Sequence, residues 1–306
     1  MEKKPLVVVN GLVRKDAIAY LKEHVDVRQW TEKTVMPREV LKEWLIDADG
    51  LWCVRPLDVD GDLVKNAPNL KVIAQAAVGY DNVNIDELTA AGIPYGNTPG
   101  VLNETVAELA FTLIATASRR IIENANFVKD GRWAQRPSNI KGFDLSRRTL
   151  GIIGMGAIGV SISRRARAFG MTVVYHNRNQ RLDDKIHKTT YMELDDLLAI
   201  SDVVCVMAPL TDETYHMCDE AFFKKMKNTA LFVNVGRGPI VDTDALINAL
   251  KTGEIDYAAL DVTDPEPLPA DHPLLDVENC LIVPHIGSYT DRTRYDMSIL
   301  TCLLYT

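Results

Sequence analysis

One segment, Thr149–Gly159 (TLGIIGMGAIG), limits the possible folds of this chain more than any other. A short apolar run, Leu150–Ile153, is followed by three glycines and by a helix predicted from Ala157 to about Phe169. In such a strand–turn–helix unit the first glycine permits a tight turn, the second lets the backbone approach a phosphate, and the third lets the helix pack on the strand. The N–H groups and positive dipole end of the helix suit a pyrophosphate. We therefore predict a dinucleotide-binding turn, with an ordinary strand-to-helix turn as the alternative; its residues are Gly154, Gly156, Ala157, Ile158 and Gly159.

Strands and helices alternate on both sides of this segment. Over residues 1–95, short apolar runs such as LVVV at 6–9 alternate with stretches of helical spacing, which predicts a parallel, doubly wound sheet. The turn-rich junction Asn97–Gly100 ends this first series. From Thr149 a second series supplies six predicted strands with intervening helices, the arrangement of a nucleotide-binding domain. The predicted fold class is therefore α/β, with two domains.

Composition and charge narrow the class of protein. The chain has 306 residues, 47% hydrophobic and 25% charged, which is ordinary for a globular protein and long enough for two domains of ~100–200 residues. The net charge of −8 argues against nucleic acid as a partner, since a phosphate-backbone binder needs a basic face. No apolar run approaches the ~20 residues needed to cross a bilayer, and no signal peptide is visible. We expect no membrane partner.

The cysteines indicate the compartment. There are five, an odd number, and no pair has C-x-x-C spacing. This pattern favours buried free thiols in a reducing cytosol. We expect a cytoplasmic protein with neither a disulfide nor a metal site.

The stretch from about Glu104 to Lys129 is predicted to be one long helix. Its first half, VAELAFTLIATA, is apolar nearly all round, so it is expected to be buried on several sides. Such a helix packs between domains or against a second subunit, and a helix in the core of one domain is an equally good interpretation.

The segment after the second strand of the second series bears on the choice of cofactor. Ligands bind beyond the carboxyl ends of such strands. A carboxylate side chain at the end of this second strand would bind the ribose hydroxyls of the adenosine. The chain has His176-Asn177-Arg178 there, and its next carboxylate is Asp183. Arg178 and Arg181 can grip a 2′-phosphate through paired N–H donors. We predict a preference for NADP(H), with NAD(H) possible; in the alternative interpretation both arginines are only solvated.

Polar residues also follow the third and fourth predicted strands. Pro209 and Thr214 come after the third, where a threonine hydroxyl could bond a phosphate. Arg237 lies between two glycines after the fourth and can pair bidentately with a carboxylate. A surface salt bridge is the alternative interpretation of Arg237.

Acid–base groups follow the last two strands. Asp261 and Glu266 come after the fifth, and His285 comes after the sixth. The unperturbed pKa of histidine, ~6.5, suits proton transfer near neutrality. A carboxylate bonded to its far nitrogen would orient the ring, raise its pKa and keep it a proton donor. A lone histidine is more often structural, but its place beside a glutamate and an arginine at the ends of strands in one sheet favours catalysis.

These segments resemble the D-isomer-specific 2-hydroxyacid dehydrogenases, and among them the glyoxylate/hydroxypyruvate reductases that also reduce 2-ketogluconate. The matching segments run from Ala76 to Thr290 and are AAVGYDNV, NTPGVLNETVAELAF, TLGIIGMGAIG, MAPLTDET, NVGRGPIVD, ALDVTDPEPLP and VPHIGSYT. The resemblance implies a Rossmann-like cofactor domain, residues 100–287, inserted in a flavodoxin-like substrate domain, residues 1–99 plus 288–306. It also implies an active site in the cleft between the domains and a homodimer formed through the helix at 104–129.

The resemblance further implies a role for each candidate site residue. His285 would be the acid that protonates the keto oxygen, Glu266 would hold His285, and Arg237 would bind the oxygens of the substrate. Main-chain N–H groups around Val78 and Gly79 would hold the substrate carboxylate. Asp261 would accept a hydrogen bond from the nicotinamide amide. The other residues expected along the cofactor, beyond the glycine-rich turn, are Asn177, Arg178, Pro209, Thr214, Val235 and Gly287.

Two features of the sequence are not explained by the resemblance to this family. After Met297 the chain runs SILTCLLYT, where the family has a longer last helix and a further segment. We expect lowered stability and apolar surface left exposed on the first domain. Arg55 follows a first-domain strand, and a solvated loop residue is the preferred interpretation over a contact to a distal hydroxyl or phosphate.

The leading prediction is an NADP(H)-dependent reductase that converts glyoxylate, hydroxypyruvate or 2-ketogluconate to D-2-hydroxy acids. One alternative is an NAD-dependent family member such as phosphoglycerate dehydrogenase. Another is a dinucleotide-binding regulator without turnover, against which the set of Arg237, Glu266 and His285 argues. A formate-type dehydrogenase is disfavoured, because Glu266 fits an acid–base pair that such enzymes lack. The physiological direction and the preferred keto acid stay open.

Overall fold

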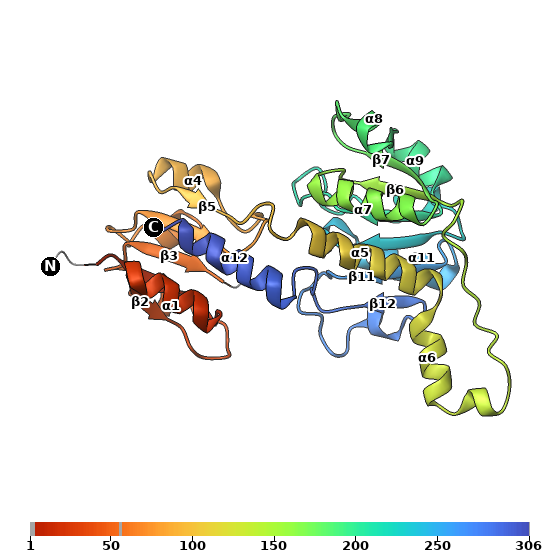
Figure 1. Ribbon diagram of the computed structural model, residues 1–306, viewed down its shortest axis with the longest axis horizontal. Coiled ribbons are helices and arrows are strands. Elements are labelled where there is room, and N and C mark those ends of the chain that lie inside the picture. Colours follow the sequence, from red (N-terminus) through yellow and green to blue (C-terminus); the bar gives the residue numbers. More distant parts are fainter. Residues whose placement is uncertain (1–3, 55–56, 306) are drawn as a thin grey trace. The chain divides into compact units, whose positions relative to one another are not determined.

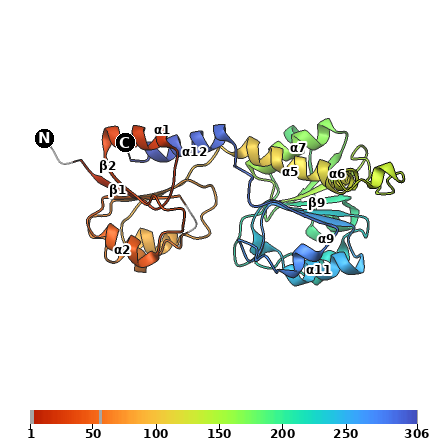
Figure 2. The same cartoon turned by 90° about the horizontal axis from the view of Figure 1, so that it is seen from below.

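The computed structural model describes residues 4–54 and 57–305 (Figure 1). The chain divides into two compact units, one made of Met1–Leu102 with Ser288–Thr306 and the other of Asn103–Gly287. Each unit has one parallel sheet with helices on both faces (Figure 2), which confirms the predicted fold class of two doubly wound α/β domains. Among the helices of the described residues, none is long and apolar enough to cross a membrane.

The sheet of the first unit has five parallel strands in the order β2-β1-β3-β4-β5. The strands are β1 (Leu6–Val9), β2 (Asp26–Gln29), β3 (Gly50–Cys53), β4 (Val72–Gln75) and β5 (Tyr95–Gly96). The helices of this unit are α1 (Lys15–His24), α2 (Arg38–Leu45), α3 (Gly61–Val64), α4 (Ile85–Ala90) and α12 (Asp291–Leu303).

Strand β1 shows why the strands of this unit are continuous apolar runs. Val7 and Val9 pack in a cluster with residues of α1 and α12, which lie side by side on one face of the sheet (Figure 2). Val8 packs in a second cluster with residues of α2, α3 and α4. Because both faces are covered by helices, no position along the strand favours a polar side chain.

The residues that follow α12 also pack on the first of these faces. The hydroxyl of Tyr305 donates to the carbonyl of Leu51 and accepts from the N–H of Ala74 at 3.1 Å. A Cβ on Gly50 would lie 2.9 Å from the Tyr305 ring, so glycine makes room for that ring. The end of the described chain thus covers part of β3 and β4, and the expected effect on stability stays a prediction.

The sheet of the second unit has seven parallel strands in the order β12-β11-β10-β9-β6-β7-β8. The strands are β6 (Thr149–Ile153), β7 (Thr172–His176), β8 (Thr190–Tyr191), β9 (Val203–Val206), β10 (Leu231–Asn234), β11 (Tyr257–Leu260) and β12 (Cys280–Ile282). The order reverses between β6 and β9, directly beside the glycine-rich turn. Ligands of open α/β sheets bind at such a switch point.

The helices of the second unit cover both faces of its sheet. They are α5 (Asn103–Ser118), α6 (Ile121–Lys129), α7 (Ala157–Ala168), α8 (Asp184–His187), α9 (Leu194–Ile200), α10 (Glu220–Lys225) and α11 (Thr243–Thr252), with short 3-10 turns η1 (Arg132–Ala134), η2 (Gly238–Ile240) and η3 (Pro273–Asp276). Figure 2 shows α5 and α7 on one side of this sheet and α9 and α11 on the other. One apolar cluster includes residues of α5 and α7, and another includes residues of α9, α10 and α11.

The single helix predicted over 104–129 is wrong, because the structure has two helices there. Arg120, between α5 and α6, has the left-handed backbone angle φ of +49°, which ends α5. The apolar residues of α5 are buried against α7, β10 and β11 of the same unit. The interpretation of α5 as a core helix therefore explains its apolar breadth without a second subunit.

The predicted count of six strands in this sheet is also wrong. The seventh, β8, has two residues, Thr190 and Tyr191, and pairs with β7 at the edge of the sheet. A strand of that length has no periodicity to detect, which explains why it was missed.

Candidate active site

The glycine-rich turn between β6 and α7 has the geometry of a phosphate-binding turn. Gly154 has a left-handed φ of +98°, and a Cβ there would lie 2.5 Å from a main-chain nitrogen. A Cβ on Gly159 would lie 2.9 Å from the carbonyl oxygen of Gly154, so glycine lets α7 pack closely. A Cβ on Gly156 would meet nothing within 4 Å, and no side chain caps the helix that follows. Uncapped N–H groups beside open space fit a dinucleotide pyrophosphate, and α7 begins with Ala157 and Ile158.

Two side chains beyond β7 brace this turn. Asn177 accepts from the N–H of Met155 at 2.6 Å, and Arg181 donates to the carbonyl of Met155 at 3.0 Å. Arg181 also donates to both carboxylate oxygens of Asp183, at 2.8 and 2.7 Å, and this bonding lowers the pKa of Asp183 to about 2. The suggestion that Arg181 grips a 2′-phosphate is therefore corrected, because its guanidinium already holds the turn.

Arg178 differs from Arg181 in its surroundings. Its side chain is 84% exposed, and its ion pair with Glu213 is 4.0 Å long. An arginine with so loose a contact can move to a new anion at little cost. Of the two arginines singled out beyond β7, Arg178 has the looser contacts, and its contact with a cofactor stays a prediction.

Two other residues expected along the cofactor, Thr214 and Val235, form hydrogen bonds with the backbone of nearby segments. The hydroxyl of Thr214 donates to the carbonyl of Pro209 at 2.7 Å and accepts from the N–H of Thr211 at 2.8 Å. Val235 is buried and donates its N–H to the carbonyl of Val206 at 3.3 Å, at the end of the β9–β10 pair. These contacts fix the backbone at the carboxyl edge of the sheet.

Arg237 follows β10 in a loop that a buried amide shapes. Asn234, 1% exposed, donates to the carbonyl of Arg237 at 2.9 Å and accepts from the N–H of Gly236 at 3.0 Å. A Cβ on Gly238 would lie 1.8 Å from the carbonyl oxygen of Thr263. Only glycine allows this approach, so the Arg237 loop is packed directly on the loop that leads to Glu266.

Glu266 and His285 form the centre of the candidate site. Glu266 Oε1 lies 2.6 Å from His285 Nδ1, and this hydrogen bond raises the pKa of His285 above its ordinary value. Burial acts to raise the pKa of Glu266, but the hydrogen bond and charge of His285 outweigh it, and the pKa is lowered. Arg237 lies near enough for its charge to act on both groups. The fold therefore brings together three side chains that follow three different strands.

Asp261, just beyond β11, holds the segment that carries His285. Its carboxylate oxygens accept from the N–H groups of Ile286 at 2.7 Å and Gly287 at 3.0 Å, and its carbonyl accepts from the N–H of His285 at 2.9 Å. These bonds keep His285 at a φ of +52°, which is uncommon outside glycine. Asp261 is 3% exposed, and burial raises its pKa. Its first role is to position His285, and a contact with a nicotinamide amide stays a prediction.

In the first unit, the segment after β4 presents main-chain N–H groups. The carbonyls of Ala77, Val78 and Gly79 each accept a hydrogen bond of 2.9 Å; the donors, in that order, are the N–H of Thr98 and the side-chain amides of Asn97 and Gln75. Among the hydrogen bonds of residues 4–54 and 57–305, none is donated by the N–H of Val78 or Gly79. Two adjacent N–H groups of this kind suit an anion.

Metal ligation is not indicated by the described part of the chain. There, no group of three or more His, Cys, Asp or Glu side chains could hold a metal ion. Arg55, considered above as a substrate contact, lies outside the described residues.

Three amide side chains were not singled out from the sequence: Gln75, Asn97 and Asn234. Gln75 ends the apolar strand VIAQ, and Asn234 ends the apolar strand LFVN. A polar residue at the end of a buried strand needs a hydrogen-bond partner, and this was the signal that could have identified both. Asn97 carries no comparable signal.

Comparison with known proteins places this geometry in a family. Residues 111–287 match the model for the D-isomer specific 2-hydroxyacid dehydrogenase, NAD binding domain. Over 298 residues the chain is 41% identical to glyoxylate reductase of Korarchaeum cryptofilum, covering 96% of this chain and 90% of that protein. Over 298 residues it is 42% identical to glyoxylate/hydroxypyruvate reductase B of Escherichia coli, covering 96% and 92%. A solved NADPH-dependent glyoxylate/hydroxypyruvate reductase from Sinorhizobium meliloti, in complex with NADP, has a TM-score of 0.89 and 30% identity, covering 98% and 92%.

Proposed function

This chain belongs to the D-isomer specific 2-hydroxyacid dehydrogenase family and is an oxidoreductase, and from that premise we propose that it reduces small 2-keto acids to D-2-hydroxy acids. The proposed substrates are glyoxylate and hydroxypyruvate, with 2-ketogluconate as a larger one. The observation that carries the proposal is the contact of 2.6 Å between His285 and Glu266 beside Arg237. The names of the relatives, glyoxylate reductase and glyoxylate/hydroxypyruvate reductase B, support the same substrates.

Each residue of the site has a separate role in this proposed reduction. A bound nicotinamide dinucleotide supplies the hydride. His285 donates the proton to the keto oxygen from Nε2, because its Nδ1 is engaged with Glu266. Arg237 pairs with the keto and carboxylate oxygens of the substrate. The N–H groups of Val78 and Gly79 hold the substrate carboxylate.

The proposed cofactor is NADP(H), with NAD(H) as the second choice. The pyrophosphate would bind at the start of α7, where the N–H groups are uncapped. Directly after β7 stands Asn177, a neutral residue whose Oδ1 is bonded to Met155, in place of a carboxylate that would repel a 2′-phosphate. The nearest carboxylate partner of Arg178 is Glu213, which is exposed and 4.0 Å away. Exposed Arg178 would pair with that phosphate.

A panel of substrates and cofactors tests the reaction. Glyoxylate, hydroxypyruvate and 2-ketogluconate are each assayed with NADPH and with NADH, and we expect turnover of the first two, faster with NADPH. His285→Ala is expected to lower kcat by about 10²–10⁴-fold. If no substrate turns over while the dinucleotide still binds, the result supports a non-catalytic dinucleotide-binding regulator instead.

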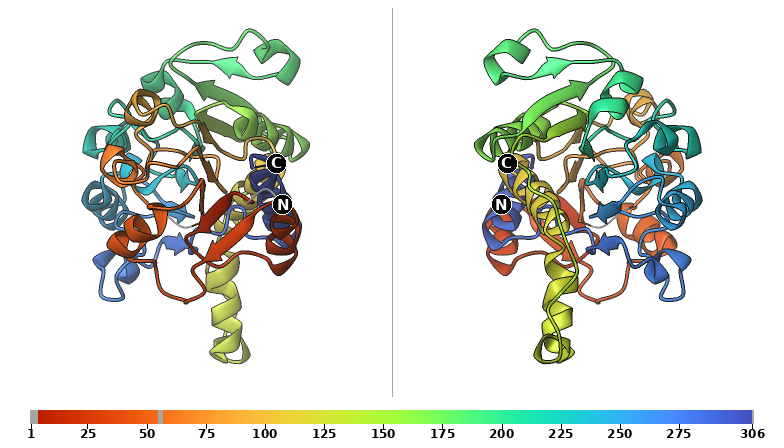
Figure 3. Two further views of the ribbon diagram at one scale, coloured as in Figure 1. Left: turned by 90° about the vertical axis from the view of Figure 1, so that its left-hand side faces the viewer. Right: turned by 90° about the vertical axis from the view of Figure 1, so that its right-hand side faces the viewer.

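A second copy of this chain is the proposed partner of α6. This helix extends away from the sheet of its own unit (Figure 3). Apolar side chains in and beside it are exposed by 43–66%: Ile121, Ile122, Val128 and Trp133. Grouped exposed apolar residues of this kind mark interaction surfaces. Since α5 is buried in its own unit, the proposed homodimer interface moves to residues 121–133, the second half of the stretch first considered and the turn after it.

The cytoplasm is the proposed location. All five cysteines are free, and four of them are buried. Burial raises the pKa of the Cys53 and Cys205 thiols to about 12, which keeps them as unreactive thiols. A reducing compartment suits a protein with this set of cysteines.

A further inference from the structure

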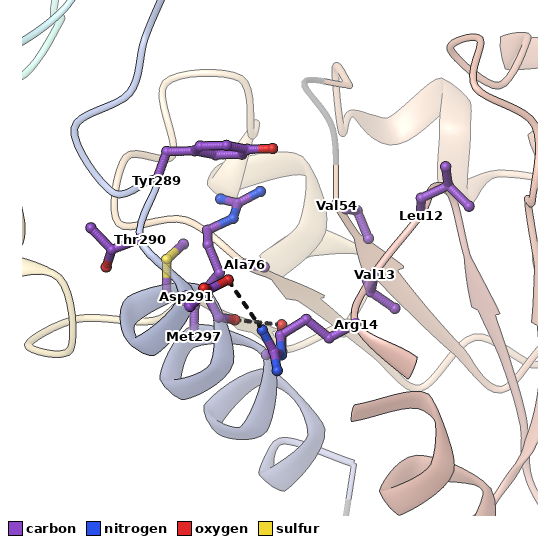
Figure 4. A pocket seen from close by; sticks show the side chains of 11 residues that line it. Leu12, Val13, Arg14, Val54, Ala76, Tyr289, Thr290, Asp291 and Met297 are labelled. Atoms are coloured by element: carbon purple, nitrogen blue, oxygen red, sulfur yellow. Dashed lines mark hydrogen bonds and ion pairs between the residues drawn. The ribbon is translucent and has the colours of Figure 1, made fainter. Parts of the chain in front are cut away.

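The first unit contains a cavity that glyoxylate is too small to fill. Its volume is about 290 Å³, near the lower end of the range for small-molecule sites. Its walls come from the segments after β1, β3 and β4 and from the start of α12 (Figure 4); they include Leu12, Arg14, Val54, Ala76 and Tyr289. The carboxyl ends of parallel strands are where α/β sheets bind ligands, so the cavity lies at the binding edge of this sheet.

Arg294, on the first turn of α12, brings a guanidinium to the wall of this cavity. The residue is half-buried, and its guanidinium carbon lies 5.7 Å from the centre of the Tyr289 ring. Among the ion pairs and hydrogen bonds of residues 4–54 and 57–305, none joins this guanidinium to a carboxylate. A partly desolvated arginine without a carboxylate partner favours an incoming anion.

Arg14, the other arginine of the cavity wall, is already neutralised. Its guanidinium lies 2.9 Å from Asp16 and 3.8 Å from Asp291, the latter pair being visible in Figure 4. Arg14 and Asp291, both in the cavity wall, are therefore engaged with each other, and Arg294 is the wall arginine for which no carboxylate partner is found among the described residues.

The place of the cavity links it to the proposed substrate. Ala76 lines it, and the unbonded N–H groups of Val78 and Gly79 follow within three residues on the same segment. Val13, Val54 and Met297 supply apolar wall against which a carbon chain can lie. A substrate whose first carboxylate is held at Val78 and Gly79 could thus place its far end beside Arg294.

We propose that this cavity binds the far end of 2-keto acids that carry a second anionic group, a carboxylate or a phosphate, and that Arg294 recognises that group. The proposal rests on the proposed function, since it assigns a substrate class to the same reductase. The planar guanidinium pairs bidentately with a carboxylate or phosphate, and the Tyr289 ring supports it from one side.

The test compares substrates that differ only at the far end. The values of kcat/KM are measured for 2-oxoadipate and 2-oxohexanoate, which have the same length and differ in the terminal carboxylate, and for 3-phosphohydroxypyruvate and hydroxypyruvate. The wild-type enzyme is expected to prefer the charged member of at least one pair by about 10-fold or more. Preference in the first pair identifies the carboxylate as the ligand, and preference in the second identifies the phosphate.

Three variants assign the preference to Arg294. Arg294→Gln is expected to lose at least about 10-fold in kcat/KM for the charged substrate and less than about twofold for hydroxypyruvate. Arg294→Lys is expected to keep part of the preference, because a point charge remains. The matched control is Arg292→Gln, two residues away on the same helix, where the arginine is 85% exposed and pairs with Asp296 at 2.7 Å; it should change neither value.

A binding measurement separates failure of this proposal from failure of the proposed function. Binding of glutarate and of pentanoate, which cannot be reduced, is followed by ligand-observed NMR in the wild type and in Arg294→Gln. Glutarate binding that Arg294→Gln abolishes supports the cavity even if no keto acid turns over. Turnover of hydroxypyruvate without any preference for a charged far end, or an equal loss on all substrates in Arg294→Gln, overturns it.

Discussion

Glu266 changes the chemistry of His285 through one hydrogen bond. Because the carboxylate raises the pKa of the imidazole, His285 stays protonated at a higher pH than an isolated histidine would. In reduction the protonated form is the reactive one, so activity is present below this pKa and is lost as the pH rises through it. Asp261 and Asn234 act through the backbone instead. Their hydrogen bonds fix the segments that carry His285 and Arg237.

Glu266→Gln is predicted to move the alkaline limb of the reductive pH profile to lower pH. Glutamine keeps a hydrogen-bond acceptor for Nδ1 but removes the negative charge that raises the pKa of His285. The measurement is kcat/KM for hydroxypyruvate across pH. Asp271→Asn, which removes an exposed carboxylate of the same unit, should leave the limb in place. An unchanged limb in Glu266→Gln would show that another group controls the profile.

Arg178→Gln is predicted to raise the KM for NADPH by about 10–100-fold and to leave the KM for NADH nearly unchanged. The reason is that only NADPH offers a 2′-phosphate to the exposed guanidinium. Arg167→Gln, on α7 of the same unit, serves as a control for loss of one positive charge. Equal effects on both cofactors would contradict the role of Arg178.

At the scale of elements, the glycines of the turn between β6 and α7 serve two purposes, packing of the protein and binding of a ligand. Gly154 and Gly159 are required by the packing of the protein itself, whereas Gly156 faces open space. A side chain at the first two positions disturbs the strand–helix unit, and a side chain at the third enters the volume proposed for the pyrophosphate.

Gly156→Ala and Gly154→Ala are predicted to impair different properties, the first dinucleotide binding and the second stability. Gly156 has a φ of −87°, which alanine adopts readily, so Gly156→Ala should keep the wild-type Tm and weaken dinucleotide binding by at least about 10-fold. Gly154→Ala must adopt a φ of +98° and approach the main chain closely, so it should lower the stability by about 1–3 kcal/mol. Thermal melts and fluorescence titration with NADPH distinguish the two. Tight NADPH binding by Gly156→Ala would place the pyrophosphate elsewhere.

The sequence predicts elements well where burial is continuous and poorly where local signals are short. The strand LVVV and its counterparts were found because helices cover both faces of each sheet. β8 has two residues, and the break at Arg120 has neither glycine nor proline to announce it. In the candidate site, likewise, some features were predictable from the sequence and others were not.

Position along the chain predicted which residues follow the strand ends, but not what each side chain would contact. The bond from Met155 to Asn177 and the pairing of Arg181 with Asp183 depend on where loops meet in three dimensions. Single-chain patterns carry no information on such meetings. The approach of Gly238 to Thr263 is a third example.

At the scale of the whole molecule, α6 is an element on which several neighbouring apolar side chains are left exposed by its own unit. A homodimer would bury that surface, and the fold of the second unit gives no other partner for it among the described residues. The prediction that follows concerns assembly rather than catalysis.

Ile122→Asp is predicted to convert a dimer into a monomer, because a charge placed in an apolar interface is costly to desolvate. Solution scattering of the wild type and the variant gives the mass of each. Leu182→Asp, at a fully exposed apolar residue outside α6, is the matched control and should remain dimeric. A monomeric wild type would reject the homodimer.

The first unit is assembled from the two ends of the chain, with the second unit between them. This arrangement delays the completion of the first unit during synthesis. At roughly 5–20 residues per second, the ribosome needs on the order of 10–40 s to make the intervening segment before α12 can emerge. During that interval Val7, Val9 and Trp52 lack the helix that later packs beside them. The part of this sheet face that α12 later covers is therefore exposed in the nascent chain for many seconds, while α1 already packs beside it.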